Sequence, residues 1–169
     1  MQDLYYDVFE SSWGWVAVCG AKNGIKYATL PEPTLDRAIF DLESVMRKPL
    51  PELEPGKFDT FKIQLEEYFA GKRKSWDVKI DTEDATEFFR RAWEACITIP
   101  FGETRSYKWL ALAAGNIAAS RGAGQAMARN RIPLIIPCHR VIGEDGELHG
   151  FGGPGLTMKK RLLELESTN

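Results

Sequence analysis

Long apolar runs, a secretion signal and a disulfide framework are all missing from this chain of 169 residues. No stretch approaches the roughly 18 apolar residues that a membrane-spanning helix needs. The N-terminus, MQDLYYDVFE, lacks the charged start and the apolar run of a signal peptide. The three cysteines, Cys19, Cys96 and Cys138, are odd in number and widely spaced, which indicates a reducing compartment. We therefore expect a cytoplasmic protein with no membrane partner.

Metal ligands are equally scarce. The histidines are His139 and His149 alone, and the chain has no Cys-x-x-Cys motif, whereas structural zinc sites are built from clusters of such side chains. We expect neither a metal nor a cofactor. Cys19 and Cys96 lie within apolar segments, and we expect both to be small core residues.

Charge is distributed unevenly along the chain. Residues 1–100 carry a net charge of −5 and residues 101–169 carry +3. Between residues 101 and 143 a single acid, Glu103, opposes six basic residues: Arg105, Lys108, Arg121, Arg129, Arg131 and Arg140. Such a local patch can attract a polyanion even in an acidic protein. Charge alone leaves open whether the patch binds nucleic acid or is an ordinary solvated face.

The first part of the chain predicts a small sheet with helices. Segments 4–9, 13–19 and 25–30 are rich in aromatic and β-branched residues, which predicts an antiparallel meander with a hairpin turn at Asn23-Gly24. Residues 34–46 and 58–69 have helical spacing of apolar residues, and Gly71 stands where a C-cap belongs. We expect a loop over residues 47–57 and a strand or extended linker over residues 76–80.

From about residue 81 the pattern becomes mainly helical. A helix is predicted over residues 82–97, and Ser106 is a plausible N-cap for a second helix over residues 107–114. Gly115-Asn116 breaks that helix, and a third runs from about residue 118 to 130. We therefore predict an α+β fold with two domains: a scaffold of antiparallel sheet and helices over residues 1–80, and a mainly helical domain with a helix-turn-helix over residues 81–169.

The helix predicted over residues 118–130 has an unusual surface. We expect its exposed positions to be small, at Ala119, Gly122 and Ala123, around the single long side chain of Arg121. A helix that reads the major groove presents several long polar side chains to the base edges. Small residues instead permit close approach of the backbone, which favours a helix in the minor groove with one protruding arginine.

An apolar run over residues 132–136, predicted as a buried strand, ends at Pro137-Cys138-His139-Arg140. A cysteine next to a histidine is weak evidence of chemistry. Adjacent residues on an extended chain point to opposite faces, so that a water or a sharp turn must mediate between them, and an isolated cytosolic cysteine is more often inert. These residues by themselves leave the inert and the reactive interpretations open.

The complete set of motifs resembles one family. The string IPCHRVI over residues 136–142 precedes Gly146, the glycine-rich HGFGG over residues 149–153, then Lys159 and LLELE over residues 162–166. Upstream lie IPFGE over residues 99–103, Ser106-Tyr107, AAGN over residues 113–116, Arg121 and AMARN over residues 126–130. Together these segments resemble the methylated-DNA–protein-cysteine methyltransferases, also called O6-alkylguanine-DNA alkyltransferases. The strong resemblance covers about residues 82–166.

The resemblance implies direct-reversal DNA repair. In it, an alkyl group passes from O6-alkylguanine, or from O4-alkylthymine, in duplex DNA to Cys138 after base flipping, once per protein molecule. The implied catalytic set is the acceptor Cys138, the base His139, its carboxylate partner Glu166, the bracing Asn130 and the proton-donating Tyr107. The implied DNA-binding set is Arg121, Tyr107, Ser120, Gly122, Ala119 and Arg129. The implied substrate pocket, in which the carbonyls of Cys138 and Val141 hold the guanine amino group, includes Met127, Pro133, Val141, Phe151, Gly152 and Lys159. Without the resemblance, Glu166 reads as a solvated acid, Asn130 as a helix C-cap and Tyr107 as a packing residue.

Some positions depart from the family pattern. Phe151-Gly152 stands where a Tyr-Ser pair is common, and Gly122-Ala123-Gly124 replaces the usual Ala-Val-Gly, which loosens that helix. We expect a monomer that binds double-stranded DNA containing alkylated guanine. The alternatives are a damage-binding relative without transfer activity, which Cys138 argues against, a helix-turn-helix regulator, and a Cys–His hydrolase that ignores DNA.

Overall fold

The computed structural model describes residues 3–148 and 155–169, and the chain divides into two compact units, residues 1–81 and 82–169. The first unit holds a four-stranded sheet and two helices, and the second is mainly helical. This content confirms the predicted α+β class. Within the described ranges, no helix has the length and apolar character required to cross a membrane.

The sheet of the first unit has the strand order β3-β2-β1-β4. The strands β1 (Tyr5–Ser11), β2 (Gly14–Ala21) and β3 (Gly24–Ala28) form the predicted antiparallel meander. The short strand β4 (Glu52–Leu53) pairs in parallel with β1 and lies inside the stretch predicted to be a loop. Two paired residues among three prolines leave no alternating pattern to detect, so the sequence could not reveal this strand.

The hairpin between β2 and β3 differs from the predicted turn by one residue. Its loop residues are Lys22 and Asn23, while Gly24 already pairs with Ala21. Gly24 has a φ of +136°, and a Cβ there would lie 2.7 Å from the backbone of Lys79. The glycine therefore serves the close approach of the extended segment over residues 77–80, which bridges to β3 between Ile80 and Ile25.

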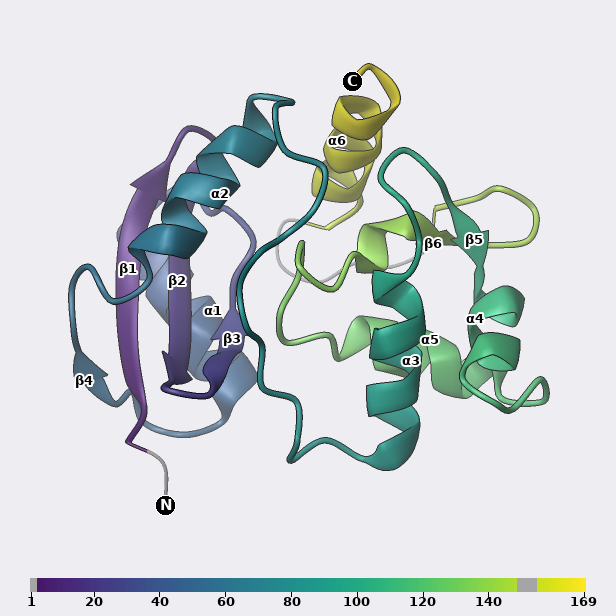
Figure 1. Cartoon of the computed structure of the whole chain (residues 1–169), viewed down its shortest axis with the longest axis horizontal. Helices are drawn as coiled ribbons and strands as arrows, with labels where there is room; N and C mark the ends of the chain where they lie inside the picture. The colour runs from purple at the N-terminus through teal and green to yellow at the C-terminus, as the bar shows by residue number, and fades with distance from the viewer. Residues whose placement is uncertain (1–2, 149–154) are drawn as a thin grey trace. The chain divides into compact units, whose positions relative to one another are not determined.

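Two helices cover opposite faces of this sheet (Figure 1): α1 (Leu35–Met46) and α2 (Asp59–Phe69). Both lie within one residue of their predicted bounds. Thr34 caps α1 through its side-chain oxygen, which accepts from the amide of Arg37, and the left-handed Gly71 follows the end of α2. One core fills the space between α1 and the sheet, and its members are Ala17, Cys19, Tyr27, Ala38, Leu42 and Met46.

The second unit contains α3 (Glu87–Ile97), α4 (Tyr107–Ala113), α5 (Ser120–Ala128) and α6 (Leu156–Ser167). A short parallel pair, β5 (Arg105–Ser106) and β6 (Val141–Ile142), and the 3₁₀ helix η1 (Cys138–Arg140) complete it. Helix α3 begins five residues later than predicted, because Thr86 caps it by accepting from the amide of Phe89. Helix α5 is likewise shorter than the predicted 118–130.

Helices α3, α4 and α5 pack together and form the helix-turn-helix part of the unit (Figure 1). The indole Nε1 of Trp93 on α3 donates to the carbonyl oxygen of Ala126 on α5, 2.8 Å away. Ala123 of α5 is fully buried at this packing, which corrects the prediction that it is exposed. Ser106 caps α4 as predicted, because its hydroxyl accepts from the amide of Trp109.

Candidate functional site

A tight turn, rather than the predicted strand over residues 132–136, presents Cys138. The amide of Ile136 donates to the carbonyl of Ile132, and Leu134 between them adopts a left-handed φ of +73°. Asn130 satisfies both ends of the turn: its Oδ1 accepts from the Ile132 amide at 3.0 Å, and its Nδ2 donates to the Ile136 carbonyl at 2.8 Å. The segment is buried as predicted. However, Pro133 has no N–H to donate to a strand ladder. The side chain of Asn130 also binds the Ile132 amide and the Ile136 carbonyl, which a ladder would use.

The thiol of Cys138 lies at the start of η1 and is 5% exposed. Its Sγ accepts a hydrogen bond from Asn130 Nδ2 at 3.0 Å. Burial raises the pKa of this thiol from an ordinary 9.0 to about 11, and the Asn130 hydrogen bond and the charge of Lys159 oppose that rise. The thiol therefore keeps its proton at neutral pH, and the site must supply both a base and stabilisation for the thiolate.

His139 and Glu166, separated by 26 intervening residues in the sequence, meet in the interior. His139 Nε2 and Glu166 Oε2 are 2.6 Å apart, and both side chains are buried. Because a carboxylate only accepts, Nε2 carries the proton and donates it to Glu166. The other nitrogen, Nδ1, is buried and has no hydrogen-bond partner among the residues that the structure describes. Burial lowers the pKa of His139, so the imidazole is neutral and Nδ1 can accept a proton.

Arg140 belongs to the same cluster, although the sequence indicated no role for it beyond the basic patch and the IPCHRVI string. It is 5% exposed, and its Nε lies 2.7 Å from Glu166 Oε1. One feature of the sequence pointed to a buried ion pair: Arg140 lies between His139 and an apolar segment, and a buried arginine requires an acidic partner. The sequence did not identify that partner as Glu166.

Tyr107 and Lys159 border the sulfur from two other helices. Tyr107 is the first residue of α4 and is half-buried; burial raises the pKa of its hydroxyl, with a further contribution from Cys138. Lys159 of α6 is buried, its Nζ donates to the carbonyl oxygen of Val141 at 2.7 Å, and it lies 5.9 Å from the centroid of the Tyr107 ring. Met127 and Pro133 are buried on neighbouring segments.

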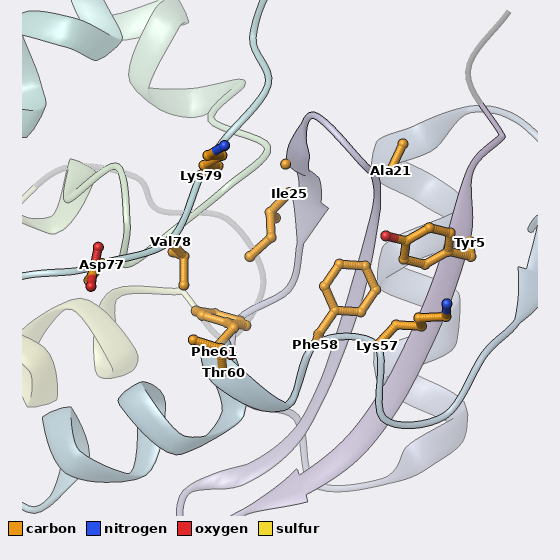
Figure 2. Close-up of a pocket in the computed structure, with 11 residues that line it drawn as sticks. Tyr5, Ala21, Ile25, Lys57, Phe58, Thr60, Phe61, Asp77, Val78 and Lys79 are labelled. Atoms are coloured by element: carbon orange, nitrogen blue, oxygen red, sulfur yellow. The ribbon is translucent and has the colours of Figure 1, made fainter.

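A hollow of about 360 Å³ opens beside this cluster, between α4, the start of α5 and the turn after β6. It is lined by Tyr107, Lys108, Ser120, Gly143, Glu144 and Asp145. A different hollow, of about 280 Å³, lies in the first unit, where Phe58, just before α2, and Phe61 of α2 face Ile25 of β3 (Figure 2). None of the predicted site residues lines that second hollow.

The predicted DNA-binding face is only partly basic. Arg121 projects from the first turn of α5 and is exposed, as are Ser120 and Arg129, and neither arginine forms an ion pair within the described residues. Ala119 precedes α5, and Gly122 is half-buried, with its Cα turned toward Phe88.

Each of the other four members of the six-residue basic patch forms an ion pair with an acidic residue. The pairs are Arg105 with Glu103, Lys108 with Glu144, Arg131 with Asp84 and Arg140 with Glu166. Sequence distance hid three of these four partners, and charge alone had left open whether the patch binds nucleic acid. What remains for a polyanion is centred on α5.

Two predicted pocket residues, Phe151 and Gly152, lie outside the described residues. Over residues 3–148 and 155–169, no three His, Cys, Asp or Glu side chains are grouped so that they could hold a metal ion. All three cysteines are free, and Cys19 and Cys96 are buried core residues as predicted.

Comparisons with known proteins agree with this arrangement. The family model for the DNA binding domain of 6-O-methylguanine DNA methyltransferase matches residues 87–168. The methylated-DNA–protein-cysteine methyltransferase of Methanosarcina barkeri is 40% identical over 169 residues, covering 98% of this chain and 99% of that protein. The protein of the same name from Mycobacterium tuberculosis is 47% identical over 115 residues, 68% of either chain.

Solved structures show the same likeness. The O6-methylguanine methyltransferase of Mycobacterium tuberculosis gives a TM-score of 0.81 at 37% identity, covering 98% of this chain and 93% of that one. The same organism's OGT in complex with DNA gives 0.82 at 36% identity, covering 97% and 93%. Because the sequence likeness runs through nearly the whole length of both compared chains, this chain belongs to the family of methylated-DNA–protein-cysteine methyltransferases.

Proposed function

We propose that this chain repairs DNA by transferring one alkyl group from the O6 atom of guanine, or the O4 atom of thymine, to the Sγ of Cys138. The observation that carries the proposal is the buried cluster in which Asn130 donates to that sulfur and the His139–Glu166 pair adjoins it. The product on Cys138 is a thioether, whose S–C bond is stable in neutral water. Each molecule therefore acts once.

The transfer is a displacement at the alkyl carbon. The S–C bond forms as the C–O bond breaks, the electron pair of that bond moves onto the guanine, and the guanine takes up one proton. The thiol proton passes to His139 Nδ1 through a water molecule, because adjacent residues do not face one another. Glu166 holds the imidazole in the tautomer that leaves Nδ1 free to accept.

The damaged base must leave the stack to reach a thiol that is 5% exposed. Arg121, on the first turn of α5, enters the duplex from the minor groove and fills the space of the flipped base. Ala119, Ser120 and Gly122 allow close approach of the backbone, and Arg129 contacts a phosphate.

The flipped guanine lies beside Tyr107, whose hydroxyl, with a pKa raised by burial, donates a hydrogen bond as the guanine becomes anionic. The Val141 carbonyl, oriented by Lys159, accepts from the guanine amino group. Met127 and Pro133 line the side of the pocket that receives the alkyl group.

We further propose that residues 81–169 carry DNA binding and transfer while residues 1–80 act as a scaffold. The protein works as a monomer on double-stranded DNA that contains alkylated guanine. Free cysteines suit a reducing compartment, and we place the protein in the cytoplasm with access to genomic DNA.

The decisive experiment incubates the protein with a duplex that contains one O6-methylguanine and maps the mass of the Cys138 peptide. We expect one methyl group per protein on Cys138, with none from an undamaged duplex and none on Cys138→Ser. Damaged DNA bound by a protein with unmodified Cys138 supports the binding-only alternative. Several products per protein molecule support the hydrolase.

A further inference from the structure

Arg140 binds the carboxylate of Glu166, which in turn binds the imidazole of His139. We propose that Arg140 is a positioning residue of the transfer reaction, which fixes Glu166 against His139 and keeps the His139 imidazole neutral and ready to accept the thiol proton. This inference rests on the proposed alkyl transfer, because that reaction gives His139 its role as a general base. The contacts among Arg140, Glu166 and His139 do not depend on the substrate.

The guanidinium of Arg140 is anchored on three sides. Its Nε donates to Glu166 Oε1 at 2.7 Å and its Nη2 to Oε2 at 3.1 Å, which is the two-pronged geometry of a strong arginine–carboxylate pair. Its Nη1 donates to the carbonyl oxygen of Ile99 at 2.7 Å, and its centre lies 5.8 Å from the centroid of the Phe101 ring. A group held in this way cannot turn without breaking buried hydrogen bonds.

This anchoring fixes Glu166 in turn. Oε1 accepts from Arg140 and from the amide of Gly102 at 3.3 Å, while Oε2 accepts from Arg140 and from His139. The carboxylate therefore cannot rotate, and the ring of His139 is set with Nδ1 on the side away from Glu166. Without Arg140, the buried carboxylate of Glu166 would lose two of the donors that hold it.

Charge gives the second consequence. A buried carboxylate favours the protonated, positively charged form of a neighbouring imidazole, so Glu166 raises the pKa of His139. Burial is the largest influence and lowers that pKa, and the cations Arg140 and Lys159 lower it further. Cys138 adjoins His139 on η1, and Tyr107 of α4 and Cys96 of α3 interact electrostatically with Cys138. With Arg140 balancing Glu166, the imidazole stays neutral until the sulfur attacks.

Lysine cannot replace Arg140 fully. A single ammonium carries the same charge but lacks the planar fork that spans two carboxylate oxygens and a carbonyl. Arg140→Lys therefore separates charge from geometry, and Arg140→Gln removes the charge while keeping one donor for Glu166. Arg91→Gln is the matched control, because Arg91 also pairs with a glutamate, Glu87, but on the exposed face of α3.

The test compares these variants in the full chain. The first measurement is the single-turnover rate of methyl transfer from an O6-methylguanine duplex, between about pH 5.5 and about pH 8.5, where an unperturbed histidine titrates. The second is an NMR titration of the His139 imidazole in DNA-free protein, with His149→Gln in every sample so that one histidine remains. Thermal unfolding reports whether each variant folds.

We expect the acidic limb of the Arg140→Gln rate profile, and its His139 titration, to move to higher pH. The rate near about pH 6 then falls at least about tenfold more than the rate on the alkaline side. Arg140→Lys should keep the limb near its wild-type position but lose about tenfold in rate, and Arg91→Gln should change neither.

A merely structural Arg140 would lower the amount of active protein and leave the limb and the NMR titration in place, which overturns the proposal. If Arg140→Gln does not fold, Arg140→Lys decides, and a wild-type rate in that variant also overturns it. Failure of the wild-type protein to accept any methyl group refutes the proposed function instead, while the NMR titration still tests the link between Arg140 and His139.

Discussion

The Nδ2 atom of Asn130 lies 3.0 Å from the Sγ of Cys138. The same nitrogen donates to the Ile136 carbonyl, and Oδ1 of Asn130 accepts from the Ile132 amide. One amide side chain thus fixes both the sulfur and the turn that presents it. The hydrogen bond also favours the thiolate, because it is the largest influence that lowers the pKa of Cys138 against burial.

Asn130→Ala tests this double role. Loss of a hydrogen bond to a developing thiolate is worth about 1.5–3 kcal/mol, so we expect methyl transfer to slow by about tenfold to a hundredfold. The turn also loses partners for two buried backbone groups, which should lower the free energy of unfolding by about 1–3 kcal/mol. Single-turnover rates and denaturant unfolding measure the two effects.

Asn116→Ala is the matched control, since its side-chain oxygen also accepts a backbone amide, that of Ala118, but at an exposed turn. We expect it to leave the transfer rate within about twofold of wild type. An Asn130→Ala protein that transfers at the wild-type rate would show that the contact with sulfur has no part in the chemistry.

Local signals predicted much of this fold because they act over a few residues. The cap Ser106 and the meander of β1, β2 and β3 were predicted from the sequence. The strand predicted over residues 132–136 was wrong, because Pro133 and the side chain of Asn130 redirect the backbone into a turn. Periodicity carries no record of such side-chain contacts.

The site was less accessible to prediction than the fold. Residue chemistry alone left Cys138 an ordinary buried thiol and Glu166 a solvated acid, and only the family resemblance paired Glu166 with His139. The family resemblance includes Arg140 in its IPCHRVI string but gave it no role, and its partner is 26 residues away along the chain. Charge pairing between distant segments is a property of the packed structure, so the sequence could not show that Lys108, Arg131 and Arg140 have acidic partners.

Arg121→Ala should separate base flipping from chemistry. Filling the space of an extruded base offsets unstacking that costs a few kcal/mol, so we expect repair of a duplex to fall by about tenfold or more. Reaction with the free base O6-benzylguanine, which needs no flipping, should stay near the wild-type rate. Equal losses on both substrates would remove the intercalating role from Arg121.

Arg129→Ala provides a contrast at the C-terminal end of the same helix. A phosphate contact acts on any sequence, so we expect weaker binding to damaged and undamaged duplexes alike and a slope of log affinity against log salt reduced by about 1. At saturating DNA the transfer rate should be unchanged. Fluorescence anisotropy over a range of salt concentrations measures the slope, and an unchanged slope would show that Arg129 makes no phosphate contact.

The raised pKa of Cys138 predicts a loss of stability in alkali. The folded protein holds the thiol proton more tightly than the unfolded chain, with a pKa of about 11 against an ordinary 9.0. This thiol therefore contributes its full stability below about pH 9 and loses it as the pH rises toward about 11, by at most about 3 kcal/mol. Cys138→Ser should lose less free energy of unfolding over that range than wild type. The same dependence of unfolding free energy on pH in both proteins would contradict the raised pKa of Cys138.

Two glycines of α5 differ in what a side chain would meet, which makes them a matched pair. Among the described residues, a Cβ at Gly124 would meet no atom within 4 Å beyond its chain neighbours and its own helix backbone, whereas one at Gly122 would lie 3.1 Å from Phe88. Gly124→Ala should therefore stabilise the helix by about 0.5–1 kcal/mol, and Gly122→Ala should gain less or lose stability. If small residues serve close approach to the minor groove, Gly124→Ala will also bind duplex DNA more weakly despite its higher melting temperature. A more stable Gly124→Ala protein that binds DNA as well as wild type would show that this glycine does not face the groove.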